Sequence, residues 1–351
     1  HGILTIIDTI LIFIDENAGT TTTDIKNTPH PTATKNKKPA RIVIVGASFA
    51  GLGTYRDLIR HGHDRPDETE IIVIDYKDYF EYVPGILRCF VDPSHLASLT
   101  RPLGDVAVAR NAVGGRARSR FVRGEVVEVD AAENFVTLDG GRRVPYDYLV
   151  LATGSTYPGP VKATAAESTL PRRSQQIHEL ARIVRDARTI GIVGGGAVGV
   201  ELAGEIAERF PKNKRVVIID RADTILPGFQ KQTKDYCRRW LEDRGVELRL
   251  GTSIVSVDDR LVTFVDGTML RADAVFKCVG ASPACAFLKA DGASGKNDDR
   301  LARTLIGPKG SIVVNDHLQV EGFDNIFCAG DACHHAASNE LKLAHTAHVN
   351  A

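Results

Sequence analysis

Apolar residues along the chain fall into short runs, and the first two runs enclose a glycine-rich stretch. Residues 41–45 form a β-branched run, residues 46–53 are rich in glycine, and residues 52–60 place apolar side chains at helical spacing. A second apolar run at residues 71–75 ends in an aspartate. Short β-branched runs predict buried strands, and a period near 3.6 predicts a helix. The stretch therefore predicts a β-α-β unit.

The same pattern recurs in the second half of the chain. Residues 189–193 are an apolar run, residues 194–199 a glycine turn, residues 200–210 a helical pattern and residues 215–220 another apolar run. Each unit is followed by further strand patterns, one of which runs into a glycine. These further strands are expected at residues 124–130, 134–138, 148–152, 247–250, 253–257, 262–265, 274–279 and 326–329.

Two β-α-β units predict an α/β fold with two Rossmann-like dinucleotide-binding domains in three layers. Because the last strand comes after the second unit, we interpret that unit as an insertion in the first domain. The expected parts are a leader at residues 1–40, the first domain at 41–155, a linker at 156–186, the inserted domain at 187–272 and the rest of the first domain at 273–351.

Composition narrows the class of partner and compartment. The 351 residues carry 44 Lys and Arg against 44 Asp and Glu, so we expect no nucleic-acid partner. Six dispersed cysteines favour a reducing, intracellular compartment. The apolar run at residues 2–14 is too short for a bilayer span and lacks the basic start of a signal peptide. We expect residues 1–40 to be a dispensable leader, with a targeting or membrane-touching segment as the alternative.

The first glycine turn contains Gly46 and Gly51 at the outer positions of G-x-G-x-x-G, with Ser48 in the middle place. The first glycine permits a tight turn, the last allows close packing of helix and strand, and the helix N-terminus attracts a pyrophosphate. Asp75 ends the second strand, where a carboxylate accepts hydrogen bonds from ribose hydroxyls. The turn therefore predicts a dinucleotide site in spite of the serine.

The second glycine turn is a complete motif formed by Gly194, Gly196 and Gly199. Asp220 ends the following strand, and its carboxylate suits the unphosphorylated ribose of NADH. Arg221 follows directly, and a guanidinium is suited to the 2′-phosphate of NADPH. We therefore favour NADH and keep NADPH as the alternative. We assign no metal site.

Five landmarks occur in order, and together they resemble the FAD-dependent pyridine nucleotide-disulfide oxidoreductase superfamily over residues 41–351. The segments YFEYVPGILRCFVDPS at residues 79–94 and LKLAHTAH at 341–348 are most similar to the branch of apoptosis-inducing-factor-like proteins, ferroptosis-suppressor-type quinone reductases and type II NADH dehydrogenases. The landmarks are GASFAG (46–51), LATGS (151–155), GGGAVGVELAGE (194–205), CVGASP (278–283) and NIFCAGDAC (325–333).

The resemblance implies that FAD occupies the first site and NADH or NADPH the second. It implies that Asp331, beside Gly330, hydrogen-bonds the ribityl chain or pyrophosphate of FAD. An acidic acceptor suits hydroxyl groups, and glycine lets a cofactor approach the backbone. Thr153 and Gly154 are expected to line the flavin, and Gly280 is expected to contact a cofactor at the corresponding turn of the inserted domain.

Two charged residues have weaker assignments by the same resemblance. Glu201 corresponds to a glutamate near nicotinamide and flavin in relatives, and its alternative is an exposed helix carboxylate. Arg88 is expected to approach the flavin or its phosphates, and its alternative is a surface arginine. Relatives carry a further C-terminal segment, so the C-terminal domain is expected to be missing here. A homodimer or peripheral membrane contact would depend on that segment, and the expected location is cytoplasmic or membrane-associated, a mitochondrial one included.

The electron acceptor is the least determined part of the prediction. Transfer to a quinone or another small acceptor is the leading hypothesis, because residues 80–84 offer aromatic and apolar side chains for such a molecule. A disulfide reductase is the second hypothesis, although Cys328 and Cys333 flank the turn expected to hold FAD. An apoptosis-inducing-factor-like binding protein switched by NADH is the third.

Overall fold

The computed structural model describes residues 39–60, 69–104, 118–211, 213–258, 260–288, 299–304 and 307–335. The chain divides into two units, His1–Lys38 and Pro39–Ala351, and the fold concerns the second. The expected leader up to residue 38 and the helix expected near residue 341 lie outside these ranges. Among the described residues, no helix combines the length and apolarity needed to cross a bilayer.

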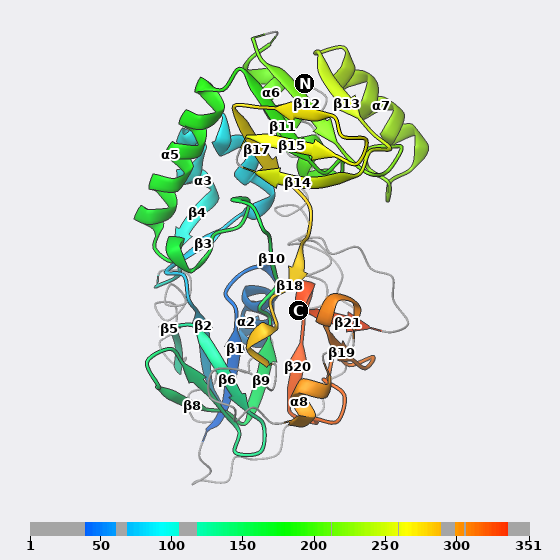
Figure 1. Ribbon diagram of the computed structural model, residues 1–351. Helices are drawn as coiled ribbons and strands as arrows, with labels where there is room; N and C mark the ends of the chain where they lie inside the picture. The colour runs from blue at the N-terminus through cyan, green and yellow to red at the C-terminus, as the bar shows by residue number, and fades with distance from the viewer. Residues whose placement is uncertain are drawn as a thin grey trace. The chain divides into compact units, whose positions relative to one another are not determined.

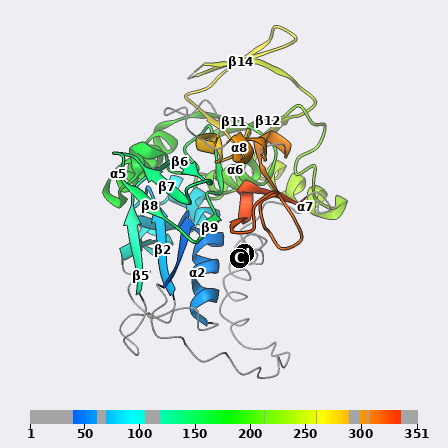
Figure 2. The ribbon, with the colours of Figure 1, turned by 90° about the horizontal axis from the view of Figure 1, so that it is seen from below.

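The first β-α-β unit forms a five-stranded parallel sheet (Figure 1). Helix α2 (Phe49–Arg60) packs on one face through Leu52 and Tyr55 (Figure 2), and a three-stranded meander covers the other. Because both faces are covered, the inner strands are nearly continuous apolar runs rather than alternating ones. In spatial order the strands are β20 (Ile326–Cys328), β9 (Tyr148–Leu151), β1 (Ala40–Val45), β2 (Thr69–Asp75) and β5 (Arg118–Arg123).

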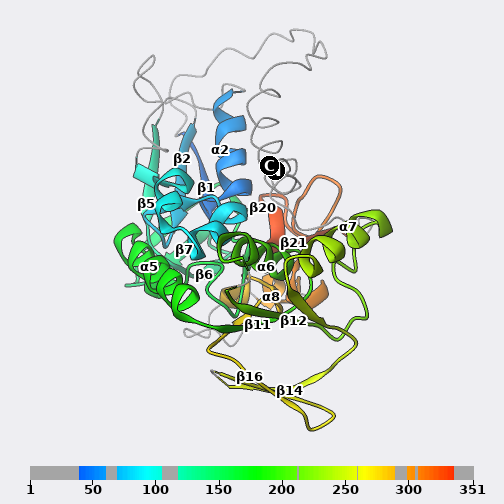
Figure 3. The same ribbon diagram turned by 90° about the horizontal axis from the view of Figure 1, so that it is seen from above.

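The second unit forms a four-stranded parallel sheet with the same plan. Helix α6 (Ala197–Arg209) packs on one face and a second meander on the other, and both layers are visible in Figure 3. Helix α7 (Lys231–Glu242) precedes the strand at the sheet edge. In spatial order the strands are β13 (Val246–Arg249), β12 (Arg215–Ile219), β11 (Thr189–Val193) and β17 (Ala274–Lys277).

The predicted insertion is confirmed by the strand order. Strands β9 and β20 are neighbours in the first sheet, yet the whole second sheet lies between them in sequence. The segments that follow β9 and β17 pair with each other, because β10 (Ser155–Thr156) is antiparallel to β18 (Ser282–Pro283). The meanders are β6 (Val126–Asp130), β7 (Phe135–Leu138) and β8 (Arg143–Pro145) in the first unit and β14 (Ile254–Asp258), β15 (Leu261–Phe264) and β16 (Met269–Arg271) in the second.

The segment expected to be a linker contains a 17-residue helix, α5 (Leu170–Asp186). Thr169 caps its N-terminus by accepting a hydrogen bond from the Arg172 amide, and a proline stands in its first turn. The second sheet also extends past residue 272, since β17 pairs with β11. The 3₁₀ segment η1 (Val83–Phe90) belongs to the same apolar core as α5 and β11, so the first part of the chain that follows β2 packs against the second sheet.

The remaining elements are short. They connect the sheets or border the glycine turns. They are β3 (Tyr79–Glu81), β4 (Thr100–Pro102), η2 (Pro93–His95), α3 (Leu96–Leu99), η3 (Ala165–Glu167), η4 (Ala286–Leu288), α8 (Asp299–Arg303), η5 (Pro308–Gly310), β19 (Ile312–Val314), η6 (Gly330–Ala332) and β21 (Cys333–His335).

Candidate functional site

The first glycine turn has the geometry that its motif predicts. Gly46 has φ +107°, and a Cβ there would lie 2.2 Å from the Ala152 carbonyl oxygen. A Cβ on Gly51 would lie 1.8 Å from the Gly46 carbonyl oxygen, so helix and strand touch at that point. Ser48 is not among the residues with positive φ, and its carbonyl accepts the Leu52 amide at 2.9 Å. A serine therefore fits the middle place without backbone strain.

Asp75 ties this turn to the end of strand β2. Its carboxylate accepts the Ala47 amide at 2.7 Å and the Lys77 amide at 2.9 Å, and the residue is 8% exposed. Each carboxylate oxygen has two lone-pair directions, so acceptor capacity remains for a sugar hydroxyl. This geometry fits the ribose-binding role that the sequence suggests.

The second glycine turn repeats the first almost contact for contact. Gly194 has φ +118°, and a Cβ on Gly199 would lie 1.9 Å from the Gly194 carbonyl oxygen. Asp220 accepts the Gly195 amide at 2.6 Å and the Ala222 amide at 2.8 Å, as Asp75 does in the first turn. The two turns are therefore structural duplicates.

Gly196 differs from its two companions. A Cβ at this position would meet no heavy atom within 4 Å, and its φ is −75°. Neither packing nor backbone conformation therefore requires glycine there. A requirement set by a bound ligand does fit, because the middle glycine of this motif lets the backbone approach a pyrophosphate. The second turn thus fits a dinucleotide by an observation independent of the motif.

Glycines with positive φ also follow the strands that lead into the site. Gly154, Gly280 and Gly330 have φ +72°, +84° and +75°. Beside Gly154, the Thr153 Oγ1 atom is buried, and within the described ranges only the Cys285 sulfur, a weak acceptor, lies against it. The hydroxyl thus has room for a stronger partner, as expected of a residue that lines a cofactor.

Asp331 has two partners that the sequence did not indicate. Its Oδ2 accepts a hydrogen bond from Ser155 Oγ at 2.5 Å, and the Lys162 ammonium lies 3.5 Å from the same oxygen. Ser155 belongs to the LATGS landmark and could have been suspected from it. Lys162 lies in no motif, so no sequence signal was available for it.

Glu201 and Arg88 lie on facing elements but do not pair with each other in the described contacts. Arg88 Nε is 3.4 Å from Glu205 Oε1, one helical turn along α6 from Glu201. Burial raises the pKa of the Tyr82 and Tyr157 phenols, and the charge of Glu201 contributes to both shifts, so both tyrosines lie near this carboxylate. The structure therefore places Glu201 among two tyrosines and a second glutamate and directs Arg88 to that second glutamate.

The pKa of Glu201 is raised to about 7, first by desolvation and then by the charge of Glu205. The side chain itself is solvent-accessible, so the surrounding protein, not complete enclosure, causes the desolvation. The pKa of Glu205 is raised by the same cause, against the lowering effect of Arg88. A carboxyl group that titrates near neutral pH is suited to holding or releasing a proton.

This raised pKa predicts a pH-dependent effect of Glu201→Gln on stability. Between an ordinary pKa of 4.5 and about 7 the folded chain keeps a proton that the unfolded chain loses, so this group destabilises the fold increasingly up to pH 7. We expect the variant to melt about 1–3 °C above the wild type at pH 8 and level with it at pH 5. Thermal melts of both proteins, with Glu208→Gln as the exposed control on the same helix, measure this. An equal shift at both pH values would contradict it.

The cysteines do not support thiol redox chemistry. No disulfide joins any of the six in the described part of the chain, and Cys328 and Cys333 are both buried. Burial raises the pKa of Cys278 and Cys285 to about 12, which disfavours the reactive thiolate. Cys333 Sγ donates to the Gly330 carbonyl at 3.2 Å. These contacts give the cysteines a packing role beside the turns.

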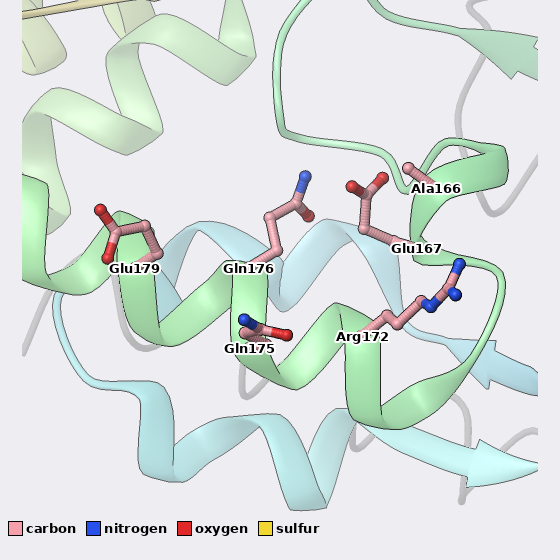
Figure 4. Close-up of a pocket in the computed structure, with 6 residues that line it drawn as sticks. All are labelled: Ala166, Glu167, Arg172, Gln175, Gln176 and Glu179. Atoms are coloured by element: carbon pink, nitrogen blue, oxygen red, sulfur yellow. The ribbon is translucent and has the colours of Figure 1, made fainter.

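A surface hollow of about 370 Å³ lies along the start of α5 (Figure 4). No residue predicted to bind a cofactor lines it. Gln176 in its wall also accepts a hydrogen bond from the buried Arg173. The hollow is therefore separate from the glycine turns. Its lining residues are Ala166, Glu167, Arg172, Gln175, Gln176 and Glu179.

Comparisons of sequence agree with this geometry. The chain matches the family described as pyridine nucleotide-disulphide oxidoreductase over residues 40–351. It is 29% identical to ferroptosis suppressor protein 1 of Homo sapiens over 324 residues, which cover 88% of this chain and 78% of that protein. It is 24% identical to apoptosis-inducing factor homolog B of Dictyostelium discoideum over 341 residues, with 91% and 80% covered.

Solved structures support the fold. The complex of putidaredoxin reductase with putidaredoxin superposes with a TM-score of 0.67 at 21% identity and covers 88% of this chain and 72% of that one. NDH2 of Plasmodium falciparum in complex with NADH superposes with a TM-score of 0.66 at 16% identity and covers 85% and 65%. The chain belongs to the pyridine nucleotide-disulphide oxidoreductase family and is an oxidoreductase with FAD and NAD(P)H as its cofactors.

Proposed function

We propose that this chain takes a hydride from NADH and passes the electrons to a quinone or another small apolar acceptor. FAD at the first glycine turn would accept the hydride and release electrons to the acceptor, chemistry that the cofactor itself supplies. The protein then contributes binding, orientation and exclusion of water. Gly46, Gly51 and Asp75 form the first turn, and Gly194, Gly199 and Asp220 form the second.

The observation that carries the acceptor proposal is a cluster of three aromatic rings at the first turn. Phe49, the first residue of α2, packs edge to face on Phe80 at 5.7 Å and on Tyr82 at 5.6 Å. All three rings are partly exposed. Tyr82 also lies near Glu201, so an apolar surface and a group that titrates near pH 7 adjoin each other. A quinone needs both, because it binds through its ring and takes up protons as it is reduced.

NADH is the proposed donor because of the Asp220 carboxylate. It is held at the second turn by two backbone amides, and its negative charge opposes a 2′-phosphate. Arg221 is exposed, and no contact fixes its guanidinium toward that position among the described residues. The carboxylate is therefore the better-placed determinant.

The test compares two acceptors in the Tyr82→Ala variant. We expect turnover of NADH with a short-chain ubiquinone to fall about tenfold in kcat/KM, since part of the proposed ring surface is lost. Turnover with ferricyanide, which needs no apolar binding surface, should stay within about twofold. The flavin absorbance of the variant shows whether cofactor content is unchanged, and Tyr236→Ala on α7 is the exposed-tyrosine control.

Other outcomes of this assay separate the alternatives. Equal losses with both acceptors would contradict a quinone surface at Tyr82. A flavin that NADH reduces but that no quinone reoxidises would contradict the proposal and favour an NADH-switched binding protein. NADH-dependent thiol formation that Cys333→Ser abolishes would favour a disulfide reductase instead.

A further inference from the structure

Lys162 is a mostly covered lysine whose ammonium group is fully engaged at the first dinucleotide site. Its Nζ lies 3.0 Å from the Ser155 carbonyl oxygen, 2.5 Å from Ser155 Oγ and 3.5 Å from Asp331 Oδ2. The side chain is 23% exposed. The Tyr157 ring lies 5.6 Å from the same nitrogen. A lysine held in this way is uncommon, because burying an ammonium group is costly without a matching charge.

The position of Lys162 in the fold also indicates a ligand-binding role. Ser155 follows the turn after β9, and Asp331 follows the turn after β20, the neighbouring parallel strand. Ligands of such sheets bind beyond the carboxyl ends of the strands. Lys162 is contributed by a later segment, after β10, so the chain returns to bring a cation to this end of the sheet.

The electrostatics of the site require such a cation. Asp331 is the residue expected to hold hydroxyl groups of FAD, and the same cofactor carries a doubly negative pyrophosphate. A carboxylate close to that group would repel it unless a positive charge compensates. Burial lowers the pKa of Lys162, while Asp331 opposes this lowering and so favours the charged form. Lys77, just after strand β2, is a second cation near enough to affect the pKa of Lys162.

We propose that Lys162 is the counter-charge of the FAD site: paired with Asp331 through Ser155, it allows the carboxylate to lie beside the anionic cofactor and thereby sets FAD affinity. This inference rests on FAD binding at the first turn. It also has a redox consequence. Reduction adds negative charge to the flavin, so a fixed cation nearby favours the reduced form and raises the midpoint potential.

The test uses the full chain, freed of flavin and titrated with FAD. We expect Lys162→Met to raise the Kd for FAD at least tenfold and to shift the flavin midpoint potential to a more negative value. Lys162→Arg keeps the charge and should stay within about threefold. The double variant Lys162→Met/Asp331→Asn removes both charges while the Asn carbonyl still accepts a hydrogen bond, so it should bind FAD more tightly than Lys162→Met alone.

Lys214→Met is the matched control, because the Lys214 ammonium is likewise held by hydrogen bonds, to two backbone carbonyl oxygens, but lies beside the second sheet. It should leave FAD binding unchanged. Ser155→Ala keeps both charges and should bind FAD more tightly than Lys162→Met. Its Kd for FAD provides a second test if Lys162→Met folds poorly. A Kd of Lys162→Met within twofold of the wild type, or no recovery in the double variant, would overturn the counter-charge role. Failure of the wild type to bind FAD would instead overturn the proposed function.

Discussion

Arg173→Met is expected to lower the free energy of unfolding by about 3–5 kcal/mol, because it leaves the buried Glu81 carboxylate without its partner. Both side chains are almost completely enclosed, Arg173 at 0% and Glu81 at 1% exposure. The guanidinium binds the carboxylate with two bonds, Nε at 2.7 Å and Nη2 at 3.0 Å. Bidentate geometry of this kind makes the pair strong and specific in orientation.

The same arginine also joins three parts of the chain. Its remaining N–H groups donate to the Pro160 and Val161 carbonyl oxygens and to Gln176 Oε1. Helix α5, the segment before it and strand β3 therefore meet at one side chain. Since η1 with Arg88 follows β3, loss of this junction is expected to loosen the elements that face Glu201 as well.

Arg182→Met on the same helix is the matched control. Arg182 pairs with Glu179, but these side chains are 56% and 53% exposed, so the loss of unfolding free energy should be far smaller than that of Arg173→Met. Denaturant unfolding of the three proteins measures both values. The double variant Arg173→Met/Glu81→Met should be more stable than Arg173→Met alone, because no buried charge is then left unpaired. A loss as small as that of Arg182→Met would refute the role of the buried pair.

The same arginine explains why the sequence did not predict α5. An amphipathic helix is recognised by its apolar stripe, and here a charged residue occupies one of the buried positions beside Ile177 and Val184. Helix α7 was not predicted for a similar reason: Leu241 is its one buried residue, so its sequence shows no apolar stripe. Most strands of both sheets, in contrast, were predicted to within a few residues, because burial on both faces makes them nearly continuous apolar runs. Strand β5 was missed, because three arginines and a serine interrupt its sequence.

The residues of the candidate site also fall into two groups, those that the local sequence predicts and those that it does not. Glycine turns and strand-end aspartates are local features, so spacing alone predicts them, and the structure gives Asp75 and Asp220 equivalent contacts. Lys162 and Glu205 act through partners far away in sequence, Asp331 and Arg88. No short motif encodes such a pairing, because the fold brings the partners together. The sequence therefore predicted the two glycine turns and the residues Arg88 and Asp331, and it did not predict the charges with which these two residues pair.

Gly199→Ala is expected to weaken NADH binding at least about 100-fold while FAD remains bound. The added Cβ would lie 1.9 Å from the Gly194 carbonyl oxygen, so α6 must move away from strand β11. The amides at the helix N-terminus then no longer converge on a pyrophosphate. The first turn is built from separate residues and should keep its cofactor. Anaerobic titration with NADH, followed by the flavin absorbance, measures the loss, and dithionite should still bleach the same flavin.

Two further glycine variants separate ligand contact from packing. Gly228 is exposed with open space around its Cβ position, so Gly228→Ala should behave as the wild type in binding and in thermal stability. Gly196 also has open space, so Gly196→Ala should keep the melting temperature of the wild type and still bind NADH more weakly. If Gly196→Ala bound NADH as tightly as the wild type, the open space at the Gly196 Cβ position would not be where the pyrophosphate binds. If Gly199→Ala did so, close contact of α6 with β11 would not be a condition for binding at all.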